Sequence, residues 1–292
     1  MITYQGQVFR PPSEANSLIL QATLGCSWNR CSFCAMYRDK AFQVRKITEL
    51  QKEIEWYAHN FPAPRKVFLA DGDAHMAKAS FLAELLDLIN ATWPDVKRVT
   101  CYSSPQSLAV RSVEEMEMLR SKKLTQYYLG IESGNDQVLV DIDKGVDAKE
   151  MIRVALKAHD AGVKLSTMIL LGMGQRALSR EHAIDSAQVV NAIQPKFVST
   201  LVVTPVEGTP LWDRDQRGEF ETLSPIELAA ELREFLANTE LKSSIFRSNH
   251  ASNYLSVAGT LPKDKAAMVS ALDQVLHDPA NARFKPEWLR AL

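Results

Sequence analysis

Short apolar segments alternate six times with longer amphipathic segments over the first 210 residues of this 292-residue chain. The short segments are rich in Val, Ile, Leu, Thr and Tyr, which is typical of β-strands, and the longer ones carry apolar residues at helical spacing. Six strands, each followed by a crossover, predict an α/β fold with a right-handed parallel sheet. The predicted strands are 17–23, 66–71, 98–103, 125–131, 164–170 and 197–203, and the predicted helices are 47–60, 78–93, 112–124, 147–162 and 179–193.

Polar or glycine-rich segments follow all six predicted strands. A parallel sheet of this kind is either open and doubly wound or curled into a barrel, and in both folds ligands bind at the carboxyl ends of the strands. We therefore expect the functional site on this rim. In chain order the rim segments are the cysteine loop 24–37, DGDAH, SSPQ, ESGN, GMGQ and TPVEGTP.

Composition excludes several classes of protein. With 46% hydrophobic residues the chain can bury a large core, and a net charge of −1 gives no sign of general attraction to nucleic acids. The amino-terminal residues show no apolar signal core, and no segment approaches the ~20 apolar residues that span a bilayer. Four cysteines are too few for a disulfide scaffold. We expect a cytoplasmic protein with no membrane partner.

Three of the four cysteines lie in the loop LGCSWNRCSFCAMY, with the spacing C-x4-C-x2-C at Cys26, Cys31 and Cys34. Structural zinc needs four ligands, usually in two short Cys/His pairs, and the sequence has one such pair, Cys31 and Cys34. His75 or Cys101 could contribute a further ligand. The spacing with a distant fourth cysteine also matches plant-type ferredoxins. Cys101, however, lies inside a predicted strand, which favours a small buried hydrophobe. The third interpretation is a four-iron cluster held by three thiolates, with one iron open to a small molecule.

The loop and its place in the chain resemble the radical S-adenosylmethionine (SAM) superfamily over residues 17–210. The strand order, the cysteine loop after the first strand and the aromatic Phe33 before the last cysteine all match. The usual family spacing is C-x3-C-x2-C, so this loop has one extra residue between Cys26 and Cys31. A short insertion in a loop costs little and does not require the thiolates to move.

The resemblance implies a partial (β/α)6 TIM-like barrel at residues 17–210. An N-terminal extension, residues 1–16, precedes it, and a mainly helical C-terminal extension, residues 211–292, covers it. Within the extension, residues 224–240 predict a helix with Ser224 as N-cap and Pro225 at its first position.

The resemblance also implies which rim residues bind the cofactors. Gly72 and Asp73 occupy the turn that receives the amino group of SAM, although Asp-Gly is also ordinary turn chemistry. YLGIESGNDQVL is similar to the fourth-strand segment of the branch of oxygen-independent coproporphyrinogen oxidase and Elp3-like enzymes. There Glu132 matches a polar residue that contacts the SAM ribose, and Lys144 matches a basic residue that pairs with the SAM carboxylate. The alternative role for Glu132 is that of an N-cap for the next helix, which Ser133 or Asn135 would fill equally well. The implied cofactor-binding residues are Phe33, Gly72, Asp73, Ser103, Glu132, Lys144 and Met168, and the implied cluster ligands are Cys26, Cys31 and Cys34.

Members of this family use a reduced [4Fe-4S] cluster to cleave SAM into methionine and a 5′-deoxyadenosyl radical, which abstracts hydrogen from a substrate. The resemblance therefore implies an iron-sulfur oxidoreductase with a small-molecule substrate and an electron donor such as flavodoxin or ferredoxin. We expect a monomer without a nucleic-acid partner. Two alternatives stay open: a haem-binding carrier of the same branch, and a tRNA-modifying radical SAM enzyme.

The tail segment 246–265, FRSNHASNYLSVAGTLPKDK, concentrates polar and aromatic residues. It is either a surface loop or part of the substrate site. In the second case His250 and Tyr254 are the candidate catalytic residues, since both side chains can exchange protons. They lie four positions apart and share a face if the segment is helical.

Overall fold

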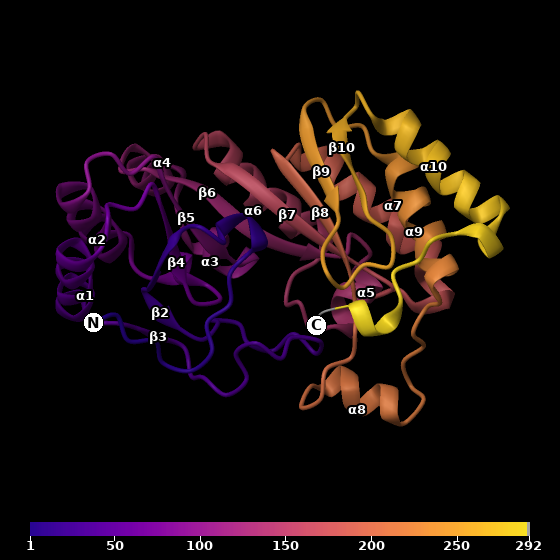
Figure 1. Ribbon diagram of the computed structural model, residues 1–292, viewed down its shortest axis with the longest axis horizontal. Coiled ribbons are helices and arrows are strands. Elements are labelled where there is room, and N and C mark those ends of the chain that lie inside the picture. Colours follow the sequence, from indigo (N-terminus) through magenta and orange to yellow (C-terminus); the bar gives the residue numbers. More distant parts are fainter. Residues whose placement is uncertain (291–292) are drawn as a thin grey trace. The chain divides into compact units, whose positions relative to one another are not determined.

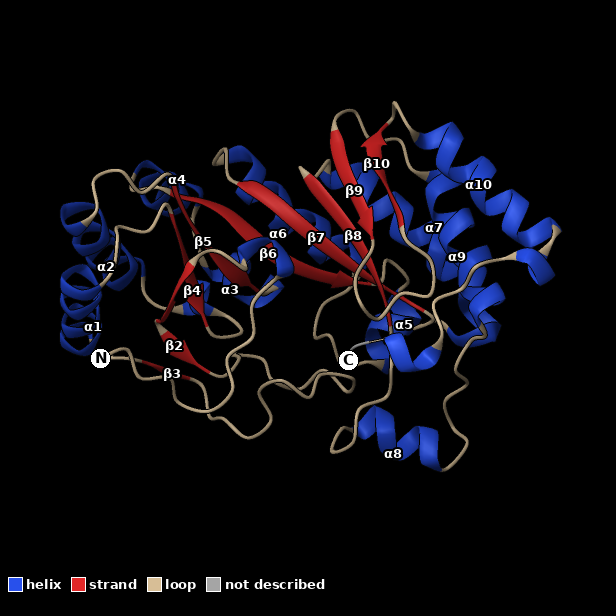
Figure 2. Cartoon of the chain, viewed as in Figure 1, coloured by secondary structure: helices blue, strands red, loops and turns tan. Residues whose placement is uncertain are grey.

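The computed structural model describes residues 1–290, and the chain divides into two compact units. Figures 1 and 2 show helices packed on parallel strands in each unit, and all six strands predicted from the sequence are present. The first unit comprises Met1–Asn29, Met36–Leu129 and Val154–Leu165, and the second comprises Arg30–Ala35, Gly130–Arg153 and Ser166–Leu292. No helix in the described residues is both long and apolar enough to cross a membrane.

The first unit is built on four parallel strands in the order β1 (Leu18–Gln21), β4 (Lys66–Ala70), β5 (Arg98–Ser103) and β6 (Leu124–Glu132). Almost every residue of β1 and β4 is buried, as expected for strands covered on both faces. Helix α2 (Ala79–Thr92) packs between α1 (Ile47–Asn60) and α4 (Val113–Ser121), while α3 (Pro105–Val110) is short (Figure 1). Strands β2 (Thr23–Leu24) and β3 (Gln43–Val44) form a small antiparallel pair that encloses the cysteine loop.

The second unit continues with β7 (Lys164–Leu171), β8 (Phe197–Val202) and β9 (Ser244–Ser248) in parallel, and β10 (Val257–Leu261) is antiparallel to β9. Helix α9 (Pro225–Asn238) packs between α7 (Gln175–Ile193) and α10 (Lys265–His277) (Figure 1). Ser224 caps α9, with Pro225 at its first position, as predicted. The remaining helices are α5 (Asp136–Asp141), α6 (Ala148–Asp160) and α8 (Pro210–Gln216).

Strands β7 and β8 bury alternate residues. Thr167, Ile169 and Leu171 are buried, whereas Met168 and Leu170 on the opposite face are only half-buried. The neighbouring strand β8 shows the same alternation. One face of this sheet is therefore covered, and the other is only partly covered.

The tail differs from the sequence-based prediction in one respect. The C-terminal extension contains the helices that were expected, but residues 244–248 and 257–261 form the pair β9 and β10, with a loop between them. His250 and Tyr254 lie in that loop. The segment is a loop of turns and not a helix, so the helical arrangement in which His250 and Tyr254 would share a face does not apply.

Candidate functional site

The cysteine loop is divided between the units, with Cys26 in the first and Cys31 and Cys34 in the second. All three cysteine residues are partly exposed, and none forms a disulfide. The N–H of Cys34 donates to the carbonyl of Cys31 at 3.2 Å. Across residues 1–290, no three Cys, His, Asp or Glu side chains come together as a ready-made metal site. The loop therefore offers three accessible sulfur donors, the ligand type that iron-sulfur clusters require.

Backbone hydrogen bonds hold the middle of this loop on both sides. Ser32 donates its N–H to the carbonyl of Ile142 at 2.9 Å, and its own carbonyl accepts from the N–H of Leu211 at 3.0 Å. Phe33 packs on an apolar cluster that includes Val203 and Leu211. The loop segment that carries Cys31 and Cys34 is thus fixed to the ends of α5 and α8.

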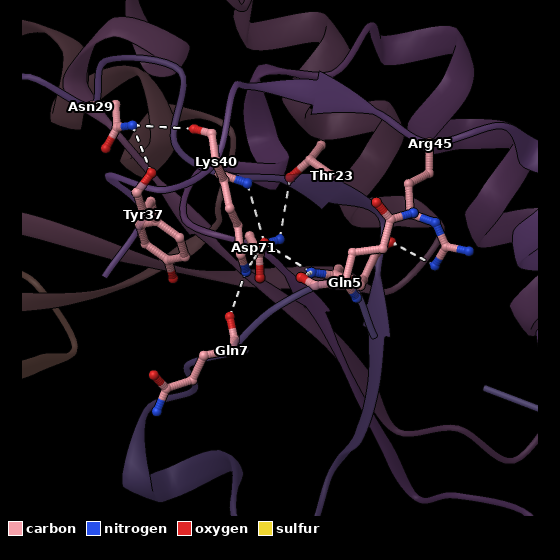
Figure 3. A network of polar contacts seen from close by, with 10 residues as sticks. Gln5, Gln7, Thr23, Asn29, Tyr37, Lys40, Arg45 and Asp71 are labelled. Atoms are coloured by element: carbon pink, nitrogen blue, oxygen red, sulfur yellow. Dashed lines mark hydrogen bonds and ion pairs between the residues drawn. The ribbon is translucent and has the colours of Figure 1, made fainter. Parts of the chain in front are cut away.

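Asp71, a residue that the sequence analysis did not select, ties the loop to strand β4 (Figure 3). Its side chain is fully buried. Oδ2 accepts from Gln21 Nε2 at 2.9 Å, from the N–H of Gly25 at 3.1 Å and from Lys40 Nζ at 3.1 Å. Oδ1 is buried without a hydrogen-bond partner in the described residues. A buried carboxylate oxygen without a partner is costly, so this atom is suited to receive a donor from a ligand.

Asp73 is also fully buried, but both of its oxygens already accept hydrogen bonds. The donors are the Ser27 hydroxyl, the N–H of Ser104 at 3.1 Å and the Ser104 hydroxyl at 2.6 Å. Burial raises the pKa of the Asp73 carboxyl, and the serine hydrogen bonds partly offset this effect. Asp73 therefore joins the cysteine loop to the rim segment after β5.

Gly72, between the two aspartates, permits a close approach. A Cβ atom at this position would lie 2.4 Å from Cε2 of Tyr37, so only glycine fits. Its N–H donates to the carbonyl of Gly25 at 3.0 Å. The DGD turn is therefore more than ordinary turn chemistry, because it is packed directly against the cysteine loop.

Ser103 lies at the end of β5 in a buried polar cluster. Its Oγ is 3.1 Å from Ser107 Oγ and 3.3 Å from His75 Nδ1. Burial, with Arg111 and Lys157 nearby, lowers the pKa of His75 to about 3, so the imidazole is neutral near pH 7. Cys101, in the same strand, is fully buried, and burial raises the pKa of its thiol. The structure thus supports the interpretation of Cys101 as a buried hydrophobe rather than a ligand.

Glu132 and Lys144, predicted to contact different groups of SAM, form a buried ion pair. Lys144 Nζ lies 3.0 Å from Glu132 Oε1, and the two residues are 7% and 8% exposed. Glu132 has a left-handed backbone with φ +67°. A Cβ atom at Gly130 would lie 1.9 Å from Oε1, so this glycine makes room for the pair. Asn135, and not Glu132, caps α5.

Met168 lies on the half-buried face of β7, beside Ser199 of β8. It is therefore not a core methionine, and its side chain is available to a ligand on this face. Glu231 of α9 fixes the turn that follows β7 through hydrogen bonds. The N–H of Gly172 donates to Oε1 of Glu231 at 2.7 Å, and Ser179 donates to Oε2.

His182 completes this buried cluster. Its Nδ1 is 2.7 Å from Ser133 Oγ, its Nε2 is 3.1 Å from the carbonyl of Leu170, and Nε2 is also 3.6 Å from Glu231. Burial raises the pKa of Glu231 to about 7 and lowers that of His182 to about 4. Sequence reasoning missed this cluster, because its members come from four separate segments of the chain.

The tail residues behave differently from one another. Tyr254 lines a pocket of about 220 Å³ at the end of β8, and its hydroxyl donates to Glu287 Oε2 at 2.7 Å. His250 does not line this pocket, and its Nδ1 lies 2.9 Å from the hydroxyl of Ser252. Asn253 fixes the loop to β8, since it accepts from the N–H of Val202 at 3.0 Å and donates to the carbonyl of Thr200 at 2.8 Å.

A family comparison accounts for the cysteine loop and the rim. The model of the radical SAM superfamily matches residues 20–187, more than half of the chain. The chain therefore belongs to the radical SAM superfamily. The cofactors of this family are a [4Fe-4S] cluster and SAM.

Two relatives show how far the similarity extends. An uncharacterized protein of Methanocaldococcus jannaschii is 22% identical over 253 residues, covering 84% of this chain and 66% of that protein. Biotin synthase of Natronomonas pharaonis is 29% identical over 143 residues, covering 47% of this chain and 36% of the synthase. The chain thus spans less than two thirds of either relative.

Solved structures confirm the fold class, an α/β partial barrel. Coproporphyrinogen III oxidase of Escherichia coli superposes with a TM-score of 0.59 and 16% identity, covering 76% of this chain and 51% of the oxidase. Methylornithine synthase superposes with a TM-score of 0.54 and 17% identity, covering 77% of this chain and 63% of the synthase. The Elp3 protein of Methanocaldococcus infernus superposes with a TM-score of 0.52 and 16% identity, covering 80% of this chain and 59% of that protein.

Proposed function

We propose that this protein is a radical SAM enzyme in which Cys26, Cys31 and Cys34 hold a [4Fe-4S] cluster. The family match supports this proposal, as do the three accessible thiols in one loop. The observation that carries it is Asp71 Oδ1, a buried acceptor without a partner beside the glycine turn that follows β4. When bound, the cluster supplies one electron to the SAM sulfonium, and cleavage gives methionine and a 5′-deoxyadenosyl radical that takes hydrogen from the substrate.

The side chains of the rim supply the contacts to SAM in this proposal. Asp71 Oδ1 accepts from the ammonium group of SAM, while Asp73 keeps the turn and the cysteine loop in place. Lys144 turns from Glu132 to the carboxylate of SAM, and Glu132 accepts from the ribose hydroxyls. Each contact is a charge-assisted hydrogen bond formed away from bulk water, the setting in which such bonds are strongest.

The half-buried face of β7 and β8 is assigned to the nucleoside, with Met168 as a contact. The substrate is a small molecule near Tyr254, and His250 orders the loop that presents Tyr254. Reduced flavodoxin or ferredoxin is the proposed electron donor.

Anaerobic reconstitution tests the proposal. The loaded protein should hold roughly four irons per chain, and a reductant with SAM should release 5′-deoxyadenosine. Replacing any of Cys26, Cys31 and Cys34 by Ala should abolish the iron, whereas Cys101→Ala, the matched control, should retain it. A cluster-loaded protein that binds SAM and releases no 5′-deoxyadenosine would refute the assigned activity. A Soret shift on haem titration would instead support the carrier alternative.

A further inference from the structure

A pocket beside Tyr254 in the second unit is the place where the proposed function puts its substrate. Its volume of about 220 Å³ is far larger than the space that one water molecule needs and is enough for a small metabolite. It has apolar and polar walls from the end of β8, the loop after it, α8 and the tail. The lining residues are Val202, Val203, Thr204, Pro205, Trp212, Asp215, Thr222, Leu223, Tyr254, Glu287 and Arg290.

Arg290, the only cation in this lining, is occupied by the protein itself. Its Nε donates to the carbonyl of Ser252 at 2.7 Å, Nη1 to the hydroxyl of Tyr254 at 2.5 Å, and Nη2 to Thr204 Oγ1 at 3.1 Å. The guanidinium also pairs with Glu287 and stacks 4.0 Å from the centroid of the Tyr254 ring. Arg290 and Glu287 therefore neutralise each other, and Arg290 has little donor capacity left for an anionic ligand.

Asp215 is the charged group in the lining without an opposite charge. Its side chain accepts one hydrogen bond, from Gln216 Nε2 at 3.2 Å, and no Lys, Arg or His of the described chain forms an ion pair with it. Trp212 lies three positions earlier on α8, so the indole ring and the carboxylate occupy the same helix face. A carboxylate beside an indole ring attracts an ammonium group through both charge and the ring quadrupole.

We propose that this pocket binds a small organic amine with an apolar body, its ammonium group held by Asp215 and Trp212. The apolar body contacts Val203, Pro205 and Leu223. An anion in the same place would meet two carboxylates and one arginine that is already engaged. The inference rests on the proposed function only in making the amine the substrate of that enzyme.

Helix α8 connects this pocket to the cysteine loop within the second unit. Leu211, next to Trp212, donates its N–H to the carbonyl of Ser32, and Leu211 belongs to the apolar cluster on which Phe33 packs. The same short helix thus forms a wall of the pocket and holds the segment with Cys31 and Cys34. Binding of the amine should therefore perturb the cluster, which provides a second readout.

Three probes of matched shape test the charge preference on the anaerobic, cluster-loaded protein. By titration calorimetry, 2-phenylethylamine should bind at least tenfold more tightly than the neutral 2-phenylethanol, and 3-phenylpropionate should bind more weakly than either. The amine should also change the electron paramagnetic resonance spectrum of the reduced cluster. Equal affinity for amine and alcohol, preference for the acid, or no binding of any probe would overturn the inference.

Two variants on one helix locate the site. Asp215→Asn should lower the affinity for the amine about tenfold and leave that for the alcohol unchanged. Asp213→Asn, an exposed residue outside the pocket lining, is the matched control and should bind the amine as the unaltered protein does. An unchanged amine affinity in Asp215→Asn would refute the assignment.

The binding assay separates this inference from the proposed function. Amine binding without 5′-deoxyadenosine formation would leave the pocket assignment intact and refute the enzymatic activity. Formation of 5′-deoxyadenosine from SAM without any amine binding would support the enzymatic activity and refute the pocket assignment.

Discussion

At the scale of single residues, the two aspartates of the DGD turn have different environments. The resemblance selected Asp73, but its oxygens are occupied by Ser27 and Ser104, whereas Asp71 keeps one buried oxygen open. No pattern of residue types distinguishes two aspartates that are two positions apart. Their partners come from segments more than 25 positions away in the chain, so the difference emerges only once the fold is known.

Asp71→Asn should weaken SAM binding more than Asp73→Asn. Losing a charge-assisted hydrogen bond costs roughly 1.5–3 kcal/mol, which corresponds to about a tenfold to hundredfold loss of affinity. Calorimetric titration of cluster-loaded variants measures this, and iron content shows whether the cluster is retained. A larger loss in Asp73→Asn than in Asp71→Asn would return the ammonium site to Asp73.

Breaking the ion pair between Glu132 and Lys144 should destabilise the fold. Lys144→Met leaves a buried carboxylate without its partner, which costs about 3 kcal/mol of unfolding free energy. The double variant Lys144→Met/Glu132→Gln should recover most of that loss, because it removes the unpaired charge. Denaturant unfolding gives both values, and Arg153→Met, which breaks an exposed pair with Glu150, is the control with little expected change.

At the scale of elements, a buried cluster joins α7, α9 and the turn after β7, and its two titratable members have opposite pH dependence. Between pH 4.5 and about 7 the folded Glu231 keeps a proton that the unfolded chain has lost, so its contribution to stability falls as pH rises. Between about pH 6.5 and 4 the unfolded chain protonates His182 and the folded protein does not, so stability falls as pH drops. The two trends largely cancel in the shared range.

Glu231→Gln should leave only the pH dependence of stability that comes from His182. The unfolding free energy of the variant minus that of the unaltered protein should rise by about 3 kcal/mol between pH 4.5 and 8. This is the free energy that corresponds to a pKa of Glu231 raised from 4.5 in the unfolded chain to about 7 in the folded protein. Denaturant titrations at several pH values measure this difference. Glu227→Gln gives a difference of the opposite sign, and at lower pH. Because the hydrogen bond from Arg176 lowers the pKa of Glu227 to about 2, that difference falls as pH rises from about 2 to 4.5 and is flat above this range. A difference independent of pH in Glu231→Gln would contradict the assignment.

The regular elements could be predicted because each carries its own periodicity. Strand β7 alternates buried and half-buried residues, and α1 repeats its apolar face every turn. The short α5 and α8 span only six and seven residues, too few for a helical pattern to repeat. Strands β9 and β10 were missed because β9 pairs with β8, a strand distant in sequence, and β10 in turn pairs with β9. The cluster ligands are proposed from local spacing alone, whereas Asp71, Glu231 and Asn253 act through contacts with residues distant in the chain.

At the scale of the whole molecule, cofactor binding should be visible as stability. A ligand that binds only the folded protein stabilises it by about 2.7 kcal/mol at a concentration of 100 times its Kd. For a chain of 292 residues, with an unfolding entropy of about 2.1 cal/mol/K per residue, that corresponds to a rise in Tm of roughly 4–5 °C. SAM should therefore raise the Tm of the cluster-loaded protein by a few degrees, measured by anaerobic calorimetry.

The same measurement on the Cys31→Ala variant tests whether the binding of SAM depends on the cluster. In the proposed site the open iron and Asp71 hold the amino group of SAM together, so a variant without the cluster loses one of the two attachments and should show little rise in Tm. Cys101→Ala removes a thiol from the core without touching the loop, so it should keep the full SAM-dependent rise above its own baseline. An equal rise in Cys31→Ala and in the unaltered protein would mean that the rim residues bind SAM without a cluster. That outcome would refute the proposed radical chemistry, although the family assignment would stand.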